Sequence, residues 1–212
     1  MREQAETIAL GLLQCGAVRW MQSKPFVWAS GWNSPIYCDN RIALSIPKFR
    51  KEVTKAIADS IRSHYPQANG IAAVATGAIA QGALVADALE LPLVYVRPAP
   101  KAHGLGNQIE GLLNTNLQWV MLEDLISTGG SSLHALEAMR GAGAHVLGMT
   151  AIFTYGFPQA EQAFEQHRCT LNTLLDYPTL LSVAQKKGLL PEHMMPSLQR
   201  WRENPAGWTF SS

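Results

Sequence analysis

The sequence is poor in charged residues. Only 16% of its 212 residues are charged, and the formal net charge is +1. A protein that binds nucleic acid broadly over its surface carries a basic excess, and an acidic tail would give a negative balance. No dense cluster of Lys and Arg occurs along the chain either. We therefore expect no nucleic-acid partner.

Cysteine and long apolar runs are also scarce. Cys15, Cys38 and Cys169 lie far apart without a C-x-x-C pair, which is typical of reduced thiols and not of a disulfide framework or a zinc site. No apolar run is long enough to span a bilayer, and the acids Glu3 and Glu6 near the start argue against a secretory signal. The sequence thus predicts a soluble, cytoplasmic protein with no membrane partner.

Enough apolar residues remain to form one large core. They make up 47% of the chain, and no repeat, low-complexity segment or linker divides it, so we expect a single domain over 1–212. From residue 70 onward, short apolar runs alternate with helical segments and Gly-rich loops. This pattern predicts an α/β fold with a parallel sheet and helices on both faces. The expected helices lie within 1–20 (ending near Gly16) and at 46–65, 79–90 and 131–141. The expected strands are 71–75, 92–97, 118–122 and 145–153, short strands fall within 26–41, and the tail 160–212 is largely helical.

The stretch from Met121 to Ser132, MLEDLISTGGSS, carries the clearest chemical signal. An apolar strand leads into Glu123 and Asp124, and a Ser-Thr-Gly-Gly turn then leads into a helix. Ligands of an open parallel sheet bind beyond the carboxyl ends of its strands, so the acidic pair is expected beside a ligand. The Gly-Gly turn and the helix N-terminus form a nest of N–H groups suited to a phosphate. The combination predicts a sugar phosphate, with its hydroxyls on the acids and its phosphate in the nest.

Simpler explanations exist for the parts of this string. A strand end followed by an ordinary turn and helix cap would account for the acidic pair alone, or for the Gly-Gly pair alone. The whole string on a strand–loop–helix frame favours the ligand site. It is not a P-loop, because no G-x-x-x-x-G-K-[ST] is present, and the Gly pairs at 104–106 and 141–143 lack the rest of a dinucleotide fingerprint.

The hydrophobic run followed by Glu-Asp and Ser-Thr-Gly-Gly resembles the motif with which type I phosphoribosyltransferases bind phosphoribosyl pyrophosphate (PRPP). Two further segments, SGWNSPIYCDNR at 30–41 and VRPAPKAHGLGNQIEG at 96–111, resemble the orotate branch of that superfamily. Similar matches at 75–82, 153–158 and 201–208 extend the resemblance over nearly the whole chain. The resemblance implies an open, mostly parallel sheet flanked by helices, with a small N-terminal hood contributed mainly by 1–45. It also implies transfer of the 5-phosphoribosyl group from PRPP to orotate, giving orotidine 5′-phosphate and pyrophosphate in pyrimidine (UMP) biosynthesis.

The resemblance also assigns residues to the donor half of the site. Glu123 and Asp124 would hold the ribose 2′- and 3′-hydroxyls, and Lys101, His103 and Asp124 would form the catalytic set. Cations facing the pyrophosphate would stabilise the charge that builds up on this leaving group. Magnesium would be held mainly by PRPP itself, with no protein ligand assigned. The PRPP-binding set that the resemblance implies is Arg97, Lys101, His103, Glu123, Asp124, Leu125, Ile126, Ser127, Thr128, Gly129, Gly130 and Ser131.

The acceptor half is assigned in the same way. Segment 30–41 would line the orotate pocket, with Tyr37 stacking on the ring, Arg41 pairing with the carboxylate and Ser127 close by. A structural hairpin with a paired arginine explains this segment equally well. The loop Thr76-Gly77-Ala78 resembles the family's pyrophosphate loop, although a plain strand–helix turn accounts for it equally.

The segment 97–111, within a polar stretch punctuated by glycines, would without the resemblance be a solvated surface loop. In the family this loop closes over the substrate of the neighbouring subunit and excludes water. The resemblance therefore implies a homodimer with active sites shared between subunits.

Several positions depart from the family pattern. Pro98 and Ala99 replace polar residues, Ala102 stands where an acid often separates the Lys and His, and Asn33 replaces a common Lys. The arginine that some members place after the strand near 150–153 is missing from 154–156. The donor half of the motif is intact, so the departures concern acceptor recognition and the electrostatics of the loop.

Two other functions stay open at this point. A phosphoribosyltransferase for another base, such as a purine, would share the PRPP motif, but segments 30–41 and 96–111 argue against it. A regulatory protein that binds PRPP without catalysis would need no cations for a leaving group, so Lys101 and His103 argue against that alternative.

Overall fold

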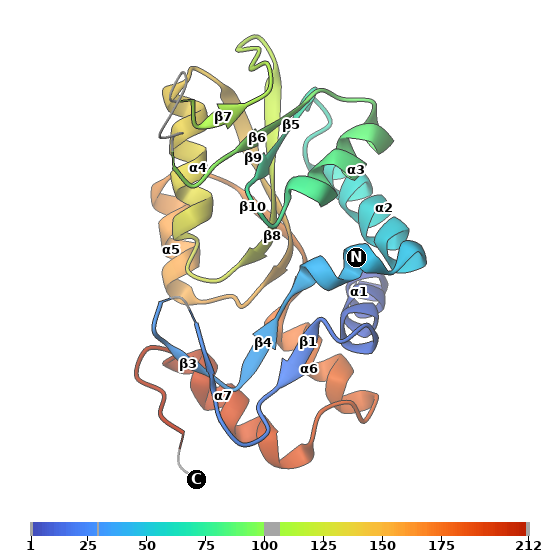
Figure 1. The fold of residues 1–212 in the computed structure, drawn as a ribbon, viewed down its shortest axis with the longest axis vertical. Helices are drawn as coiled ribbons and strands as arrows, with labels where there is room; N and C mark the ends of the chain where they lie inside the picture. The colour runs from blue at the N-terminus through green and yellow to red at the C-terminus, as the bar shows by residue number, and fades with distance from the viewer. Residues whose placement is uncertain (1, 29, 100–106, 211–212) are drawn as a thin grey trace.

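A six-stranded sheet forms the centre of the protein. The structure, a computed structural model, describes residues 2–28, 30–99 and 107–210 (Figure 1). The strand order is β10-β9-β8-β5-β6-β7, and every neighbouring pair is parallel except β6 and β7. The α/β fold with a mostly parallel sheet is therefore confirmed. The strands are β5 (Gly70–Val74), β6 (Leu93–Val96), β7 (Ile109–Glu110), β8 (Gln118–Ile126), β9 (His145–Thr154) and β10 (Leu171–Asp176).

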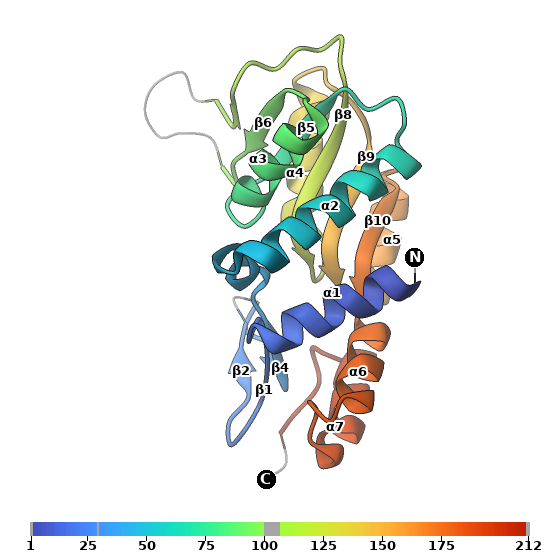
Figure 2. The same ribbon diagram turned by 90° about the vertical axis from the view of Figure 1, so that its right-hand side faces the viewer.

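Helices cover both faces of this sheet (Figure 2). One face packs against α1 (Arg2–Gln14), α2 (Pro47–His64) and α3 (Ile79–Leu89), and the other against α4 (Gly130–Gly141) and α5 (Pro158–Gln166). Along β8, Val120 and Leu122 join the first core, whereas Trp119 and Met121 join the second. Because successive strand residues face opposite sides, a strand covered on both faces must be apolar throughout. Each such side chain stabilises the fold by about 1.5–3 kcal/mol through burial.

A second, smaller part of the protein lies at the carboxyl end of the sheet and is called the hood below. Its N-terminal half contains β1 (Val18–Trp20), β2 (Phe26–Val27), β3 (Asn33–Ser34), β4 (Ile36–Cys38) and the 3-10 helix η1 (Asn40–Ser45). In Figure 1 these strands lie beside α6 (Tyr177–Lys186) and α7 (Met195–Glu203), which follow β10 and are separated by the 3-10 helix η2 (Glu192–Met194). Indole N–H groups join the two halves: Trp20 donates to Leu189 O at 2.8 Å and Trp201 donates to Asn33 O at 3.0 Å. The C-terminal segment therefore belongs to the hood together with residues 18–45.

Most elements lie where the sequence predicts them, and the differences have local causes. The first helix ends at Gln14, close to the end expected near Gly16, and Gly16 takes a φ of +77° and turns the chain into β1. β8 continues past Leu122 to Ile126, since β9 pairs with it as far as Thr154. The tail expected to be helical contains β10, which pairs with β9 at the edge of the sheet. Among the described residues, no helix is long and apolar enough to cross a membrane.

Candidate active site

The sheet reverses its winding direction between β5 and β8. From β5 the chain crosses to β6 on one side, and it then returns to β8, β9 and β10 on the other side. The loops that follow β5 and β8 consequently diverge, and ligands of open α/β sheets bind in the crevice between such loops. The two loops are residues 75–78 and 127–129, and both belong to segments that the sequence singles out.

Asp124 lies where these two loops approach each other. β5 pairs with β8 only as far as Leu122, so the edge of β8 is open at the next residues. The half-buried Asp124 carboxylate lies against Gly77, and a Cβ added to Gly77 would overlap its oxygens. Only glycine allows the backbone to come this close to the carboxylate. The structure thus brings together two motifs that are 47 residues apart (124 − 77).

Glu123 has a different environment from its neighbour Asp124. Its side chain is buried, with Oε2 accepting from Ser132 Oγ at 2.8 Å and Oε1 accepting from the Asp124 N–H at 3.0 Å. Burial, and then the charge of Asp124, raise the pKa of Glu123 well above its ordinary value. The acidic pair therefore consists of one carboxylate that faces the crevice and one that ties the strand to the first turn of α4.

The turn after β8 presents unpaired backbone donors. Within the described part of the chain, the N–H groups of residues 127–132 donate to no acceptor, and the first bond of the turn runs from Leu133 N to Gly129 O at 2.9 Å. Gly129 has a φ of +82°, a conformation that favours glycine. Consecutive free amides at the start of a helix form an anion site. The Ile126 side chain, in contrast, is buried in the core beneath α4 and α5, and the partly buried Leu125 side chain packs against the opposite core.

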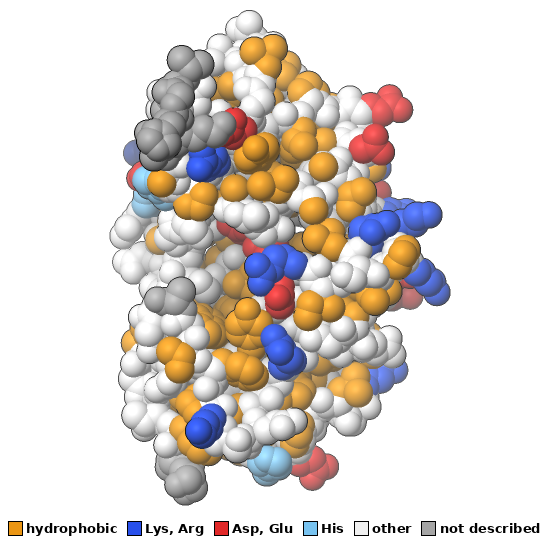
Figure 3. Space-filling model, viewed as in Figure 1, with side chains coloured by type: hydrophobic (Ala, Val, Ile, Leu, Met, Phe, Trp, Pro, Cys, Tyr) orange, Lys and Arg blue, Asp and Glu red, His pale blue; other side chains and the backbone are white. Residues whose placement is uncertain are grey.

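Segment 37–41 of the hood reaches the same place. The Arg41 guanidinium donates to both carboxylate oxygens of Asp39, at 2.7 and 2.9 Å, and these hydrogen bonds lower the pKa of Asp39. Asp39 in turn raises the pKa of Arg41, and Asp124 adds a smaller contribution, so Arg41 lies within electrostatic range of Asp124. Figure 3 shows basic and acidic side chains side by side at the middle of the molecule, between the sheet and the hood. Tyr37 packs against Phe26, with ring centroids 5.5 Å apart, and Arg19 lies over its ring at 5.1 Å.

Arg97 stands at the base of the long loop after β6. Its N–H donates to Gln108 O at 2.8 Å and its carbonyl accepts from Gln108 Nε2 at 3.0 Å, so the two ends of the loop are joined. Arg97 Nη1 lies 3.7 Å from Glu110 Oε1. Lys101 and His103 lie outside the described residues.

The comparisons with known proteins agree with this geometry. The chain is 50% identical over 208 residues to the orotate phosphoribosyltransferase of Bacteroides fragilis, and the aligned residues cover 98% of each chain. It is 49% identical over 201 residues to that of Cytophaga hutchinsonii, covering 95% of this chain and 96% of the relative. The protein belongs to the orotate phosphoribosyltransferase family. The crystal structure of the orotate phosphoribosyltransferase of Aeropyrum pernix gives a TM-score of 0.73 at 25% identity and covers 87% of this chain and 99% of that chain. A scan against models of known protein families gives no match.

Two segments that resemble orotate phosphoribosyltransferases meet in the hood. The sequence lacks an arginine at 154–156, but Arg202 of α7 donates to Tyr155 O at 3.2 Å and to Gly156 O at 3.0 Å. A guanidinium from the segment 201–208 thus holds the segment 153–158. This contact could not be predicted from either segment alone.

Sequence reasoning also missed two buried polar residues at the site. Ser132 is fully buried on Glu123, and Asn40 donates from Nδ2 to Asp124 O at 2.6 Å. Ser132 stands directly after the predicted phosphate turn, so its position in the motif was the available signal. Asn40 gave no signal of its own, because its partner is 84 residues away.

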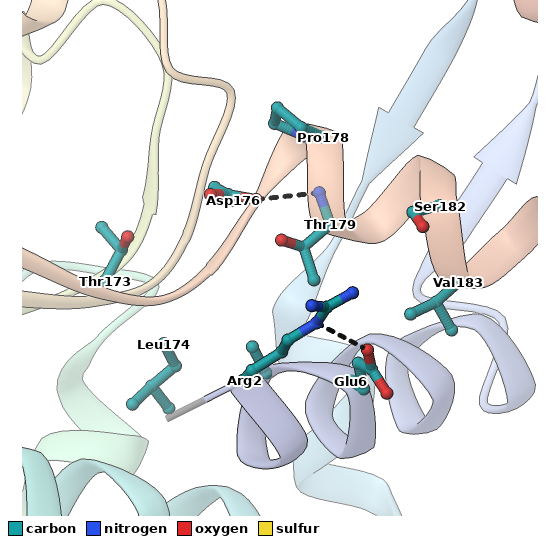
Figure 4. Close-up of a pocket in the computed structure, with 10 residues that line it drawn as sticks. Arg2, Glu6, Thr173, Leu174, Asp176, Pro178, Thr179, Ser182 and Val183 are labelled. Carbon is teal, nitrogen blue, oxygen red and sulfur yellow. Dashed lines mark hydrogen bonds and ion pairs between the residues drawn. The ribbon is translucent and has the colours of Figure 1, made fainter.

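Hollows also occur away from the crevice. One of about 470 Å³ lies between α1, β10 and α6 (Figure 4). The charged and capping groups drawn there are already paired within the chain: Arg2 with Glu6, and the Asp176 carboxylate with the Thr179 N–H. Among the described residues, no group of three or more His, Cys, Asp and Glu side chains is placed to hold a metal ion.

Proposed function

We propose that the protein transfers the 5-phosphoribosyl group of PRPP to orotate in the crevice between the ends of β5 and β8, releasing orotidine 5′-phosphate and pyrophosphate. The observation that carries this proposal is the position of Asp124. It lies against Gly77, and in the sequence it comes shortly before the free amides of 127–132. A carboxylate next to an anion nest matches a ribose that bears a 5′-phosphate.

Each part of PRPP has a matching group in this crevice. The free amides of Ser127 to Ser131 at the start of α4 receive the 5′-phosphate. Asp124 accepts hydrogen bonds from the ribose hydroxyls. Glu123 already accepts one hydrogen bond at each carboxylate oxygen, so its share of the ribose uses the lone pairs that remain. The loop Thr76-Gly77-Ala78 lies on the pyrophosphate side.

The chemistry of this reaction requires charge stabilisation at both ends of the breaking bond. As pyrophosphate leaves, the ribosyl carbon gains oxocarbenium character and the leaving group gains negative charge. Asp124 faces the first charge, and Arg97, Lys101 and His103 supply cations for the second. Magnesium carried by PRPP adds further stabilisation of the pyrophosphate. The half-buried Asp124 carboxylate presents oxygens of the kind that magnesium accepts.

The hood supplies groups that bind the acceptor, orotate. Arg41 uses Nε and Nη2 on Asp39, which leaves Nη1 for the orotate carboxylate. Tyr37 and Ser127 complete the acceptor side. The enzyme works as a homodimer in the cytoplasm, and the loop that carries Lys101 and His103 closes over the crevice of the neighbouring subunit. The free thiols of Cys15, Cys38 and Cys169 support a reducing compartment.

The test is a substrate comparison. The protein is incubated with PRPP, magnesium and either orotate, uracil or a purine, and loss of orotate absorbance or formation of the nucleotide is followed. We expect uracil to react at least about 100-fold more slowly than orotate, because it leaves the groups for the carboxylate unpaired. Comparable turnover of uracil, or faster turnover of a purine, would contradict the choice of orotate. An Asp124→Asn variant with normal kinetics for PRPP would contradict the donor site itself.

A further inference from the structure

Asn40 joins the two halves of the proposed site. It is the first residue of η1 in the hood, its side chain is only 3% exposed, and its Nδ2 donates to the carbonyl oxygen of Asp124 in β8 at 2.6 Å. Its Oδ1 accepts from Cys38 Sγ at 3.2 Å, which fixes the orientation of the amide. The neighbouring Arg41, which we assign to orotate, follows it directly in sequence. The buried Asn40 side chain thus connects segment 30–41, which we assign to orotate, to β8, which we assign to the ribose.

The carbonyl of Asp124 lies beyond the part of β8 that β5 covers. On the β5 side, the pairing of β8 ends at Leu122. On the other side, the register of β8 with β9 continues from Glu123 opposite Ala151 to Leu125 opposite Phe153. The Asp124 N–H donates to Glu123 Oε1 and its carbonyl accepts from Asn40 Nδ2, so both of its backbone groups are held by side chains. A buried carbonyl left without a donor would cost stability or would rotate to find one.

We infer that Asn40 is a positioning residue that fixes the Asp124 carboxylate for the ribose by holding the Asp124 carbonyl from the hood. This inference rests on the ribose role of Asp124 in the proposed function. If the carbonyl is released, the peptide after Asp124 can turn, and the carboxylate then moves relative to Gly77 and the phosphate turn. Binding of PRPP should therefore weaken even though Asn40 does not contact it.

An Asn40→Asp substitution separates this role from simple packing. Aspartate has nearly the shape of asparagine, but its ionised form only accepts hydrogen bonds and would oppose the Asp124 carbonyl, whereas its protonated form can donate. The charged and titratable groups around position 40 are Cys38, Asp39 and Arg41 of its own segment and Glu123 and Asp124 of β8. Dividing by the wild-type value at each pH removes the pH dependence that these groups give to the wild-type protein.

We expect the KM for PRPP of Asn40→Asp to exceed that of the wild type by roughly tenfold at about pH 8.5 and to approach it as the pH falls to about 6. Asn40→Ser, whose shorter hydroxyl does not reach the carbonyl, should raise this KM by a similar factor at every pH. The matched control is Asn172→Asp in β10. The Asn172 side chain also donates a hydrogen bond, to Tyr65 Oη at 2.8 Å, but it has no part in the proposed site. The KM for PRPP of this control should stay at the wild-type value throughout.

Two results would overturn the inference. A KM ratio of Asn40→Asp that stays constant with pH would show that the substitution acts through packing alone. If Asn40→Asp does not fold, an unchanged KM for PRPP in Asn40→Ser also overturns the inference, because it shows that the contact of Asn40 has no effect on PRPP binding. Asp124→Asn is measured in parallel: if it leaves the KM for PRPP unchanged, the proposed ribose site fails, whereas a raised KM in Asp124→Asn with normal Asn40 variants overturns only the role of Asn40.

Discussion

At the scale of single residues, Glu123 is the most unusual titratable group of the site. Its side chain is 5% exposed, and Ser132 and the Asp124 N–H donate to its two oxygens. Burial raises its pKa above the ordinary 4.5, and the charge of Asp124 raises it further. The folded protein thus binds the proton of Glu123 more tightly than the unfolded chain does. This contribution to stability is complete below the ordinary pKa and is lost as the pH rises through the raised value.

The first prediction follows from this sign. A Glu123→Gln variant keeps a side chain of similar shape but has no proton to lose. We expect its free energy of unfolding to change less with pH than that of the wild type, so the variant gains relative stability as the pH rises above 4.5, the ordinary pKa of a glutamate. Urea unfolding at several pH values measures the difference. The control is Glu192→Gln in η2, an exposed glutamate that should leave the pH dependence unchanged. Parallel curves for Glu123→Gln and the wild type would show that Glu123 ionises normally in the fold.

At the scale of elements, the loop after β5 and the end of β8 must approach closely. An added Cβ on Gly77 would overlap the Asp124 carboxylate, so Gly77→Ala should displace this side chain while leaving the sheet intact. We expect the KM for PRPP to rise roughly tenfold or more, with little change in Tm. Steady-state kinetics and thermal unfolding provide the two measurements.

Gly141→Ala at the end of α4 is the matched control for Gly77→Ala. An added Cβ there has nothing within 4 Å, so its kinetics should match the wild type. If Gly77→Ala binds PRPP normally, the Asp124 carboxylate is free to move aside, and the close approach has no role in PRPP binding.

The same scale explains what could be predicted from the sequence. Helix α2 was predicted with Pro47 in its first turn, and β5 and β9 were predicted from their apolar runs, because these signals lie within the residues of each element. The end of β8 and the edge strand β10 were not predicted. Both depend on pairing with β9, which a helix and loops separate from each of them in the sequence. The acidic pair and the Gly-Gly turn were recognisable because strand, acids and turn are contiguous. Asn40 and Arg202 could not be recognised, because their partners are carbonyl groups that any residue could provide.

At the scale of the whole molecule, the proposed dimer predicts that two inactive variants restore each other. Asp124→Asn removes the ribose carboxylate, and Lys101→Ala removes a cation of the closing loop, so each variant alone should be nearly inactive. In a mixed dimer with shared sites, one crevice combines both defects and the other has neither. Random reassortment makes about half of the dimers mixed, so about a quarter of the wild-type activity should return.

Mixing after subunit exchange, followed by the orotate assay, measures this recovery. Mass spectrometry of differently tagged subunits verifies that exchange has taken place, and each variant mixed with itself serves as the control. If Lys101 served its own subunit, every crevice would keep one defect. Verified exchange without recovered activity would then count against shared sites.

The hydrogen bonds that join the two halves of the hood also affect when the hood folds. Trp20 bonds to Leu189, which is 169 positions further along the chain. Asn33 bonds to Trp201, which is 168 positions further along. During synthesis the N-terminal hairpins leave the ribosome long before these partners exist, whereas neighbouring strands of the sheet follow one another more closely. Contacts of such high sequence separation form late and slowly. The ribose crevice can therefore begin to take shape first, and the pocket for the acceptor is completed only when the last helix arrives.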